Sequence, residues 1–436
     1  MKALVVFEDH GVAAFEMLAA LRANFDLRCG SRTLLERLCA DAGATHTILM
    51  VRPALQPLIA ETHPDTLLEL QATAVPVDFV NGRLLSMGTD LERLLTGPAA
   101  GFVRFHDDTL IAARLAGADA VRVAAELQAR LANPTSHALP SWCERVLPHV
   151  PRLGVAAGEL RSGSRLLDHA WDLVACNGLA LVDDFRKSAG AGIATEALLY
   201  PGVHLLQDGA IRIEAGARIK PGVVLDAEDG PITIGAEVVV QPNVVVRGPA
   251  AIGARCVLKA GAKIHEGVSL GPACKIGGEV EESIVQAFSN KQHEGFLGHA
   301  YLGEWVNLGA DTNNSDLKNN YSNVRVWENG RSLDTGLRFV GLIASDHVKS
   351  AINTQFNTGT VVGLASQVFG SGFPPKFIPP FSWGGGESLQ LYEARRALET
   401  ARTVMERRGI RMSAAYEARF LAEFEAWSDA PRSPHS

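Results

Sequence analysis

The chain has 436 residues, more than one hydrophobic core usually serves, so two domains and a terminal extension are expected. Apolar residues make up 47% and charged residues 20%, proportions typical of folded globular proteins rather than disordered chains. Lysine and arginine total 41 against 48 aspartates and glutamates, a formal charge of −7, and no basic block could neutralise a run of phosphates. These numbers exclude nucleic acid as the main partner.

No apolar run is long enough for a membrane span, and the strand-like run at residues 2–7 meets Glu8, Asp9 and His10 too soon for a signal peptide. A cytoplasmic protein without a membrane partner is therefore expected. The six cysteines are scattered without any C-x-x-C pair, so the sequence predicts neither a zinc site nor a disulfide framework.

The first part of the chain alternates strand-like and helix-like runs. Strands are expected at residues 3–7, 46–51 and 75–80, and helices at 12–23 and 33–42, which is an α/β pattern. From about residue 101 to 200 the composition predicts helices, including residues 111–115 and 121–131. The first domain is therefore expected over residues 1–200, as an α/β domain with a helical connector.

An aliphatic residue then recurs at every sixth position. After Ile213, Ile219 and Leu225, eight consecutive positions follow the rule: Ile234, Val240, Val246, Ile252, Leu258, Ile264, Leu270 and Ile276. Since roughly one residue in four or five is aliphatic, chance would give this on the order of once in 10⁵ starting points. The repeat predicts a left-handed parallel β-helix, in which three hexapeptide units close one triangular coil around a shared aliphatic axis. An antiparallel sandwich, the alternative, would alternate with period two.

The β-helix domain is expected over residues 201–385. Interruptions are expected between residues 276 and 296 and between 313 and 338, and they would leave loops on the faces of the solenoid. Beyond the proline-rich segment 373–380, residues 387–427 predict one or two amphipathic helices that cap the solenoid or pack on a neighbouring subunit. These helices belong to a C-terminal extension over residues 386–436.

Histidine is the side chain that could serve as a base near neutral pH. His293 lies in the first expected interruption, and His299 and His347 have the same claim on chemistry alone. The simplest interpretation of one histidine in a polar loop is a solvated side chain.

Residues 293–298 (H-E-G-F-L-G) and 306–312 (V-N-L-G-A-D-T) resemble the acetyltransferase half of the bifunctional N-acetylglucosamine-1-phosphate uridyltransferase/glucosamine-1-phosphate acetyltransferase family. Both segments match the family's spacing without a gap. The resemblance implies that His293 is the catalytic base and Asn307 a sugar-site residue, while Phe296 replaces a tyrosine that contacts the sugar phosphate. It also implies that Asn320 and Tyr321 lie at the substrate site after a short insertion, although a gapless count would place Asp316 there instead. With a three-residue offset, Ser345 falls at the position of the acetyl-CoA site.

The wider chain resembles sugar nucleotidyltransferases fused to hexapeptide acyltransferase domains. A working nucleotidyltransferase carries a glycine-rich loop after its first strand, whereas residues 8–11 here are E-D-H-G. Arg28, Gly30 and Arg32, just before an expected helix, are the nearest substitute for binding nucleotide phosphates, although structural surface cations explain the arginines equally well. Arg83, in a segment shared with this group, completes the candidate nucleotide-binding set.

The sequence therefore predicts an acetyl-CoA-dependent acyltransferase that acts on an amino sugar, as a sugar phosphate or nucleotide sugar. The resemblance implies a homotrimer. Two alternatives stay open: a bifunctional enzyme that also makes a UDP-sugar with Mg²⁺, and a non-catalytic trimer that binds sugar nucleotides. No resident metal is expected, since the acidic pairs Asp107–Asp108 and Asp183–Asp184 are weak candidates for Mg²⁺.

Overall fold

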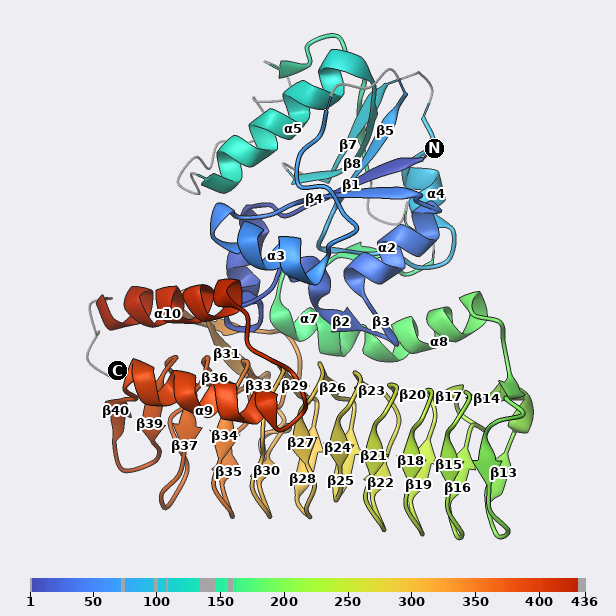
Figure 1. The fold of residues 1–436 in the computed structure, drawn as a ribbon, viewed down its shortest axis with the longest axis vertical. Coiled ribbons are helices and arrows are strands. Elements are labelled where there is room, and N and C mark those ends of the chain that lie inside the picture. Colours follow the sequence, from blue (N-terminus) through green and yellow to red (C-terminus); the bar gives the residue numbers. More distant parts are fainter. Residues whose placement is uncertain are drawn as a thin grey trace. The chain divides into compact units, whose positions relative to one another are not determined.

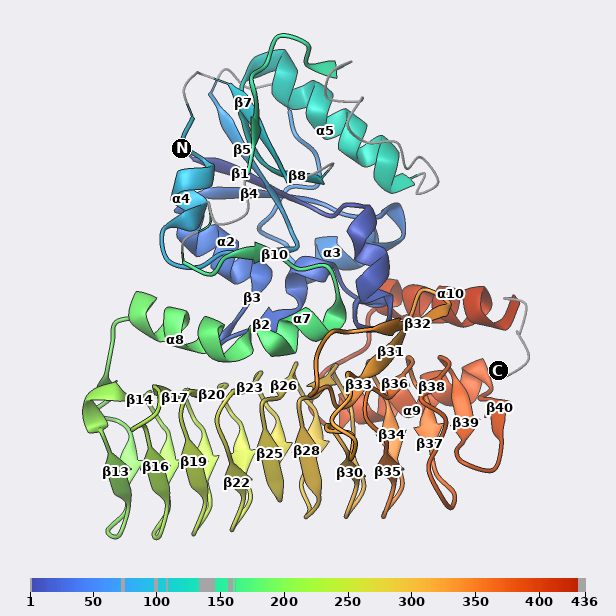
Figure 2. The same ribbon diagram turned by 180° about the vertical axis from the view of Figure 1, so that it is seen from behind.

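The structure is a computed structural model that describes residues 2–71, 75–97, 101–106, 109–132, 146–155, 160 and 162–429. The chain forms two compact units, each described here by itself: Met1–Leu27 with Arg32–His169, and Arg28–Ser31 with Ala170–Ser436 (Figures 1 and 2). The domain boundaries expected from the sequence stay a prediction. Among the described helices, none is both long and apolar enough to cross a membrane.

The first unit is built on a mixed β-sheet with the strand order β4-β1-β5-β8-β7-β9. Its strands are β1 (Ala3–Phe7), β4 (His46–Met50), β5 (Val77–Asn81), β7 (Phe102–His106), β8 (Thr109–Leu115) and β9 (Arg152–Gly154). β1 runs parallel to both β4 and β5, whereas β8 is antiparallel to β5 and β7. The α/β class expected for this part of the chain is confirmed.

Helices connect these strands: η1 (His10–Phe15), α1 (Glu16–Ala19), α2 (Leu34–Ala42), η3 (Pro53–Leu55), α3 (Gln56–Thr62), α4 (Asp90–Leu94) and α5 (Gly117–Ala132). A capping box starts α2, because the Thr33 hydroxyl accepts from Glu36 N and the Glu36 carboxylate accepts from Thr33 N. The expected helix at residues 33–42 is thus confirmed, and the one at 121–131 lies within α5. The helix expected at 12–23 is shorter, formed by η1 and α1.

Residues 111–115 are a strand, and the expected helix there is wrong. They belong to β8, which pairs with β5 on one side and β7 on the other. Ile111, Ala112 and Ala113 are almost completely buried between these neighbours. Hydrogen bonding to two strands and burial of both faces outweigh the helix propensity of this alanine-containing run.

The second unit is the predicted left-handed parallel β-helix, whose strands stack in rows in Figures 1 and 2. Its first face consists of β11 (Gly192–Ile193), β14 (Ile211–Ile213), β17 (Ile232–Ile234), β20 (Ala250–Ile252), β23 (Val268–Leu270), β26 (Ile284–Val285), β29 (Tyr301–Leu302), β33 (Ile343–Ala344), β36 (Val361–Val362) and β38 (Phe377–Ile378). The second consists of β12 (Leu198–Leu199), β15 (Arg218–Ile219), β18 (Val239–Val240), β21 (Val257–Leu258), β24 (Lys275–Ile276) and β27 (Asn290–Lys291). The third consists of β13 (His204–Leu206), β16 (Val224–Asp226), β19 (Val245–Arg247), β22 (Lys263–Ile264), β25 (Glu279–Glu281) and β28 (Phe296–Gly298).

The six-residue repeat is the inward column of this solenoid. Ile234 pairs with Ile252, which in turn pairs with Leu270, and all three side chains are buried. Backbone also packs closely where the chain turns: a Cβ at Gly253 would lie 2.5 Å from the Leu270 carbonyl oxygen, so glycine is required there. The inward aliphatic residues form one apolar cluster along the axis.

The interruption expected between residues 276 and 296 is wrong, because β25, β26 and β27 continue the coil. Ile264 pairs with Val280 and Ile276 with Lys291, separations of 16 and 15 residues in place of 18. The turns are shorter here, and a lysine takes an inward position. Both changes removed the aliphatic signal at the sixth position without removing the fold.

The second interruption is a true excursion, as expected. β30 (Asn313–Asn314) pairs with β35 (Gln355–Phe356), and between them the chain forms a hairpin of β31 (Arg325–Glu328) and β32 (Arg331–Asp334). The later coils add β34 (Lys349–Ser350), β37 (Gln367–Val368) and β39 (Ser382–Gly384).

Helices flank the solenoid within the second unit: α7 (Ala170–Ala175), α8 (Asn177–Lys187), α9 (Ala394–Glu406) and α10 (Ala414–Asp429). Two C-terminal helices were within the expectation, but residues 389–391 form a strand, β40 (Leu389–Leu391), paired with β39. Phe420 of α10 packs edge-on against Phe381, with ring centroids 5.2 Å apart. This contact ties the extension to the last coils.

Adjacent residues of β19 test the register of the column. Val246 points inward and is fully buried, whereas Val245 is 36% exposed. Val246→Asp would place an unpaired charge in the apolar axis and should lower the free energy of unfolding by at least about 3 kcal/mol or prevent folding. Val245→Asp is the matched control and should melt close to wild type in a thermal denaturation. Equal melting of the two variants would contradict this register.

Candidate functional site

His293 lies at the corner of the coil between β27 and β28, and its side chain is exposed. The corner backbone is held from two sides. The His293 carbonyl oxygen accepts from Lys291 Nζ at 3.1 Å, and the Glu294 carbonyl accepts from Asp311 N of the next coil at 3.1 Å. Gly295 has φ 117°, and a Cβ there would lie 2.3 Å from the Thr312 carbonyl oxygen. The imidazole therefore projects from a fixed backbone.

Lys291 is a buried amine that sequence reasoning missed. It occupies the inward position that Ile276 fills one coil earlier, and its residue is 1% exposed. Its Nζ donates to the carbonyl oxygens of Gly277, at 3.0 Å, and of His293. Burial lowers the pKa of this amine from its ordinary 10.5 to about 8. The lysine therefore joins the solenoid wall to the His293 corner.

Asn307 lies one coil beyond Asn290, on the same face. Asn290 Nδ2 donates to Asn307 Oδ1 at 3.4 Å, and the Arg408 guanidinium donates to Asn290 Oδ1 at 2.7 Å. Arg408 also donates to the Ala273 carbonyl at 2.9 Å. Residues beyond α9 thus help to position the predicted sugar-site asparagine, and no local sequence signal marks Arg408.

The other predicted substrate residues lie in two places. Phe296 opens β28, and its backbone N–H donates to Asn313 Oδ1 at 2.8 Å, so it stays close to the His293 corner. Asn320 and Tyr321 lie in the excursion, where the Asn320 side chain accepts from Ser322 and Tyr321 is 65% exposed. No hydrogen bond within the described part of the chain joins Asn320 or Tyr321 to His293. The substrate-site roles of Asn307, Phe296, Asn320 and Tyr321 all stay predictions.

Ser345, the predicted acetyl-CoA residue, directly follows β33. Its backbone N–H donates to the Val362 carbonyl at 2.9 Å, and the residue is 1% exposed. Its hydroxyl is buried and has no hydrogen-bond partner among the residues that the structure describes. An unpaired buried hydroxyl costs about 1–3 kcal/mol, and such groups often mark functional positions. Its role at the donor site stays a prediction.

Backbone donors of the candidate phosphate-binding segment are already engaged within the second unit. Arg28 N donates to Gln286 Oε1 at 3.1 Å and to Tyr301 Oη at 2.9 Å, and Gly30 N donates to Asn177 Oδ1 at 2.7 Å. Arg32 lies in the short strand β3 (Arg32–Thr33) and is partly exposed. These contacts give Arg28 and Gly30 a structural role, and nucleotide binding by Arg28, Gly30 and Arg32 stays a prediction.

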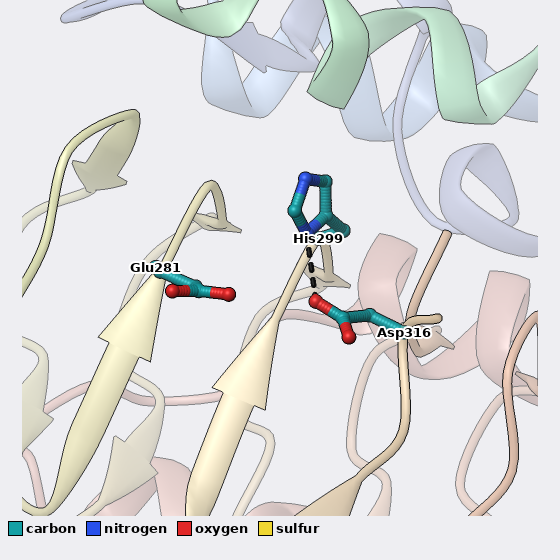
Figure 3. Close-up of side chains that lie close together, drawn as sticks. All are labelled: Glu281, His299 and Asp316. Atoms are coloured by element: carbon teal, nitrogen blue, oxygen red, sulfur yellow. Dashed lines mark hydrogen bonds and ion pairs between the residues drawn. The ribbon is translucent and has the colours of Figure 1, made fainter. Parts of the chain in front are cut away.

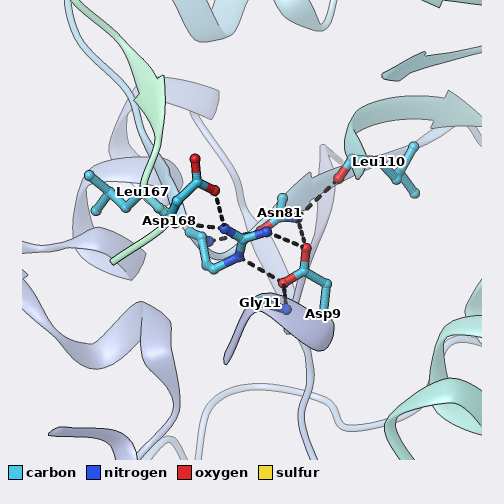
Figure 4. Close-up of polar contacts among 7 residues, drawn as sticks. Asp9, Gly11, Asn81, Leu110, Leu167 and Asp168 are labelled. Atoms are coloured by element: carbon cyan, nitrogen blue, oxygen red, sulfur yellow. Dashed lines mark hydrogen bonds and ion pairs between the residues drawn. The ribbon is translucent and has the colours of Figure 1, made fainter. Parts of the chain in front are cut away.

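A polar network of the first unit includes Asp9, Asn81 and Asp168 (Figure 4), and Arg83 lies at its centre. Its Nε and Nη2 donate to the two carboxylate oxygens of Asp9, both at 2.8 Å, and its Nη1 donates to the Leu167 carbonyl and to Asp168 Oδ1. Burial alone would raise the pKa of Asp9, but the Arg83 charge and hydrogen bonds from Arg83 and Asn81 lower it. The guanidinium thus bridges separate segments, and its predicted role in nucleotide binding stays untested.

Of the two acidic pairs weighed for Mg²⁺, the described residues contain only Asp183–Asp184, and both carboxylates there are engaged by other groups. Asp183 pairs with Lys187 at 2.9 Å, and Asp184 accepts from the Ser31 backbone N–H and hydroxyl at 2.8 and 3.0 Å. Asp107 and Asp108 lie outside the described residues.

A different cluster gathers Glu281, His299 and Asp316, drawn in Figure 3. His299 Nδ1 lies 2.8 Å from Asp316 Oδ2, and the imidazole stacks on the Phe339 ring with centroids 4.9 Å apart. Burial, followed by the charge of Asp316, raises the pKa of Glu281. The sequence analysis missed this cluster, although its members are 18 and 17 residues apart, about one coil each, which is the signal that could have found it.

Two protein families match separate parts of the chain. Residues 4–190 match the family described as sugar nucleotidyl transferase, and residues 231–266 match the bacterial transferase hexapeptide repeat. The predicted resemblance, a nucleotidyltransferase-like domain followed by a hexapeptide domain, is confirmed by these matches. Both families are described as transferases.

Relatives cover only part of the chain. The bifunctional protein GlmU of Synechococcus sp. (strain CC9311) is 32% identical over 152 residues, 34% of this chain and 31% of that protein. The GlmU of Rippkaea orientalis (strain PCC 8801 / RF-1) is 29% identical over 195 residues, 43% of this chain and 39% of that protein. The chain thus spans well under half the length of these relatives. A solved UDP-N-acetylglucosamine acyltransferase of Francisella novicida is 12% identical, with a TM-score of 0.29, over 55% of this chain and 90% of that one.

Lys291 gives a test through the pH dependence of stability. Its unfolded-state pKa is near 10.5 and its folded-state pKa is about 8, so between these values the unfolded chain holds more protons. The free energy of unfolding of wild type should therefore rise with pH across this interval, relative to Lys291→Met, by on the order of 3 kcal/mol. Urea denaturation at both ends of the interval measures it. Lys263→Met, at a more exposed lysine of β22, controls for the loss of one amine. If the difference in unfolding free energy between Lys291→Met and wild type stayed constant with pH, the burial of Lys291 would be contradicted.

Proposed function

We propose that this chain is an acyltransferase that moves the acetyl group of acetyl-CoA to the amino group of a sugar phosphate or nucleotide sugar. The main supporting observation is the His293 corner, where an exposed imidazole projects from a backbone held by Lys291 and Gly295. Histidine is the side chain best suited to accept a proton near neutral pH. A rigid backbone beneath it favours the precise placement that general-base catalysis needs.

In the proposed reaction, the acceptor nitrogen attacks the thioester carbonyl while His293 removes its proton. The C–N bond forms, the tetrahedral oxyanion collapses, and the C–S bond breaks. The thiolate leaves with the electron pair of that bond and takes the proton back from the imidazolium. Backbone N–H groups at the coil corners are the candidate donors to the oxyanion.

Substrate roles follow from position. Asn307 would bind the sugar beside the base, with Asn320 and Tyr321 of the excursion completing its site, and Ser345 would lie at the donor. Phe296 lacks the hydroxyl of the family's tyrosine, so we expect an acceptor specificity different from that of glucosamine-1-phosphate acetyltransferases. We further propose that three copies assemble and that adjacent subunits share each site.

His293→Ala tests the assignment of the base. We expect kcat to fall by roughly 10²- to 10⁴-fold while the thermal melt stays close to wild type, because the side chain is exposed. Free thiol released from acetyl-CoA measures the rate. His204→Ala, at an exposed histidine of β13, is the matched control and should keep the wild-type rate. A His293→Ala enzyme as fast as wild type would exclude His293, and His299 would be the next imidazole to test.

A second candidate function is uridylyl transfer from UTP to a sugar-1-phosphate, favoured by the family match over residues 4–190. The local structure after β1 argues for weak activity. Glu8 is fully buried and accepts from Asn24 N and from Arg52, while Asp9 is paired with Arg83. These side chains stand where a working enzyme has a glycine-rich phosphate loop. Loss of part of such an electrostatic clamp typically costs about 10²- to 10³-fold in rate per donor.

We therefore expect UTP and UDP-sugars with Mg²⁺ to bind weakly or not at all in calorimetry. Pyrophosphate release from UTP and a sugar-1-phosphate should stay well below ordinary enzyme rates of about 1 to 10³ per second. Turnover in that range, abolished by Arg28→Ala, would instead establish a bifunctional enzyme. Absence of both thiol and pyrophosphate release, with tight binding of a nucleotide sugar, would favour a non-catalytic binding protein.

A further inference from the structure

The Glu281, His299 and Asp316 cluster combines one imidazole with a carboxylate from the coil before it and a carboxylate from the coil after it. One potential ligand atom from each residue lies within 4.8 Å of the others. Figure 3 shows both carboxyl groups directed toward the side of the imidazole that carries the hydrogen bond to Asp316. We propose that this cluster is a binding site for one divalent transition-metal ion, of which Zn²⁺ is the best-fitting example.

Charge supports a cation at this place. Asp316 has His299 as its ion-pair partner, and among the described residues Glu281 forms no ion pair with a lysine or arginine. Two carboxylates that converge in a partly buried site repel each other. A dication between them would neutralise both charges, as the ion of a metal site commonly does. Glu279, two residues before Glu281 in β25, differs from Glu281 because two basic side chains already flank it. His265 and Lys263 lie 3.3 and 3.8 Å from its carboxylate.

The geometry is close to that of a metal site. Zinc–ligand bonds of about 2.0–2.2 Å place neighbouring ligand atoms roughly 3–3.5 Å apart. His299 Nδ1 and Asp316 Oδ2, 2.8 Å apart, already lie near this separation. The Glu281 carboxylate therefore has to move closer, which its flexible side chain allows. On binding, the metal takes the place of the proton between Nδ1 and Asp316, and the neutral imidazole carries its proton on Nε2. Three protein ligands leave a position for water or substrate.

The donor set selects the class of metal. Mg²⁺ and Ca²⁺ prefer sites made of oxygen atoms alone, whereas an imidazole beside carboxylates suits Zn²⁺ and similar ions. The Phe339 ring holds the His299 imidazole against one face, so the ligand nitrogen is oriented before the ion arrives. This site is separate in residues from the proposed base His293 and does not rest on the proposed acyl transfer.

Equilibrium dialysis of the full chain, stripped with a chelator, tests the proposal with Zn²⁺ alone. We expect about one Zn²⁺ per chain, and at least a roughly 10-fold weaker affinity in Glu281→Gln and in Asp316→Asn, variants that keep the side-chain shape. Glu279→Gln, two residues earlier in the same strand β25, is the matched control and should bind as wild type does. Mg²⁺ at equal concentration should not displace Zn²⁺.

Co²⁺ gives an independent readout, since its visible absorption reports an imidazole and carboxylate ligand set directly. The spectrum of bound Co²⁺ should be lost in His299→Ala and kept in Glu279→Gln. The proposal is wrong if Zn²⁺ binds the Glu281→Gln/Asp316→Asn double variant as tightly as wild type, or does not bind wild type. Equal weakening in Glu279→Gln would mean diffuse surface binding, and displacement by equal Mg²⁺ would exclude the transition-metal assignment.

Discussion

Parallel stacking of coils around an apolar axis is the constraint on which the second unit depends. Each inward residue lies on its counterpart one coil away, as Ile264, Val280 and Leu297 do, and all three are buried. No coil could bury this surface alone. The same stacking brings residues about one coil apart in sequence into contact at the corners. The solenoid thus provides both its own stability and the precise placement of polar side chains outside it.

Two polar residues that enter the axis are satisfied by backbone groups. Lys291 gives its amine to the Gly277 and His293 carbonyls, and the inward Asn314 accepts from Gly298 N and donates to the Gly298 carbonyl, at 3.0 and 2.9 Å. Both lie in the coils where the turns depart from the regular repeat. His293, on the proposed acyl-transfer corner, and the cluster that contains His299 lie in these same coils. Departure from an ideal repeat and candidate function therefore coincide, as expected where local regularity is given up for chemistry.

The sequence predicted whatever depended on local periodicity. The aliphatic repeat predicted the β-helix, and the helix-like run at residues 33–42 predicted α2, whose capping box the structure then showed. Prediction failed where tertiary contacts decide: β8 is a strand because two neighbours pair with it, and β27 continues a coil although its inward residue is a lysine. Arg408 contacts residues 135 and 118 positions away, so no motif spacing revealed it. The Glu281 cluster was missed although its members repeat about one coil apart, because its polar residues are not part of the aliphatic pattern that marks the repeat. The chemical assignment of His293 came from resemblance, and its exposed position on a fixed corner is compatible with that role.

The most direct test of the account is acyl transfer itself. The wild-type chain should be incubated with acetyl-CoA and a panel of amino-sugar phosphates and nucleotide amino sugars, with free thiol and the mass of each sugar measured together. The account predicts thiol release that depends on one class of sugar, in equal amount with a product that has gained one acetyl group. Folded protein that releases no thiol above the rate without sugar, across the whole panel, would contradict it.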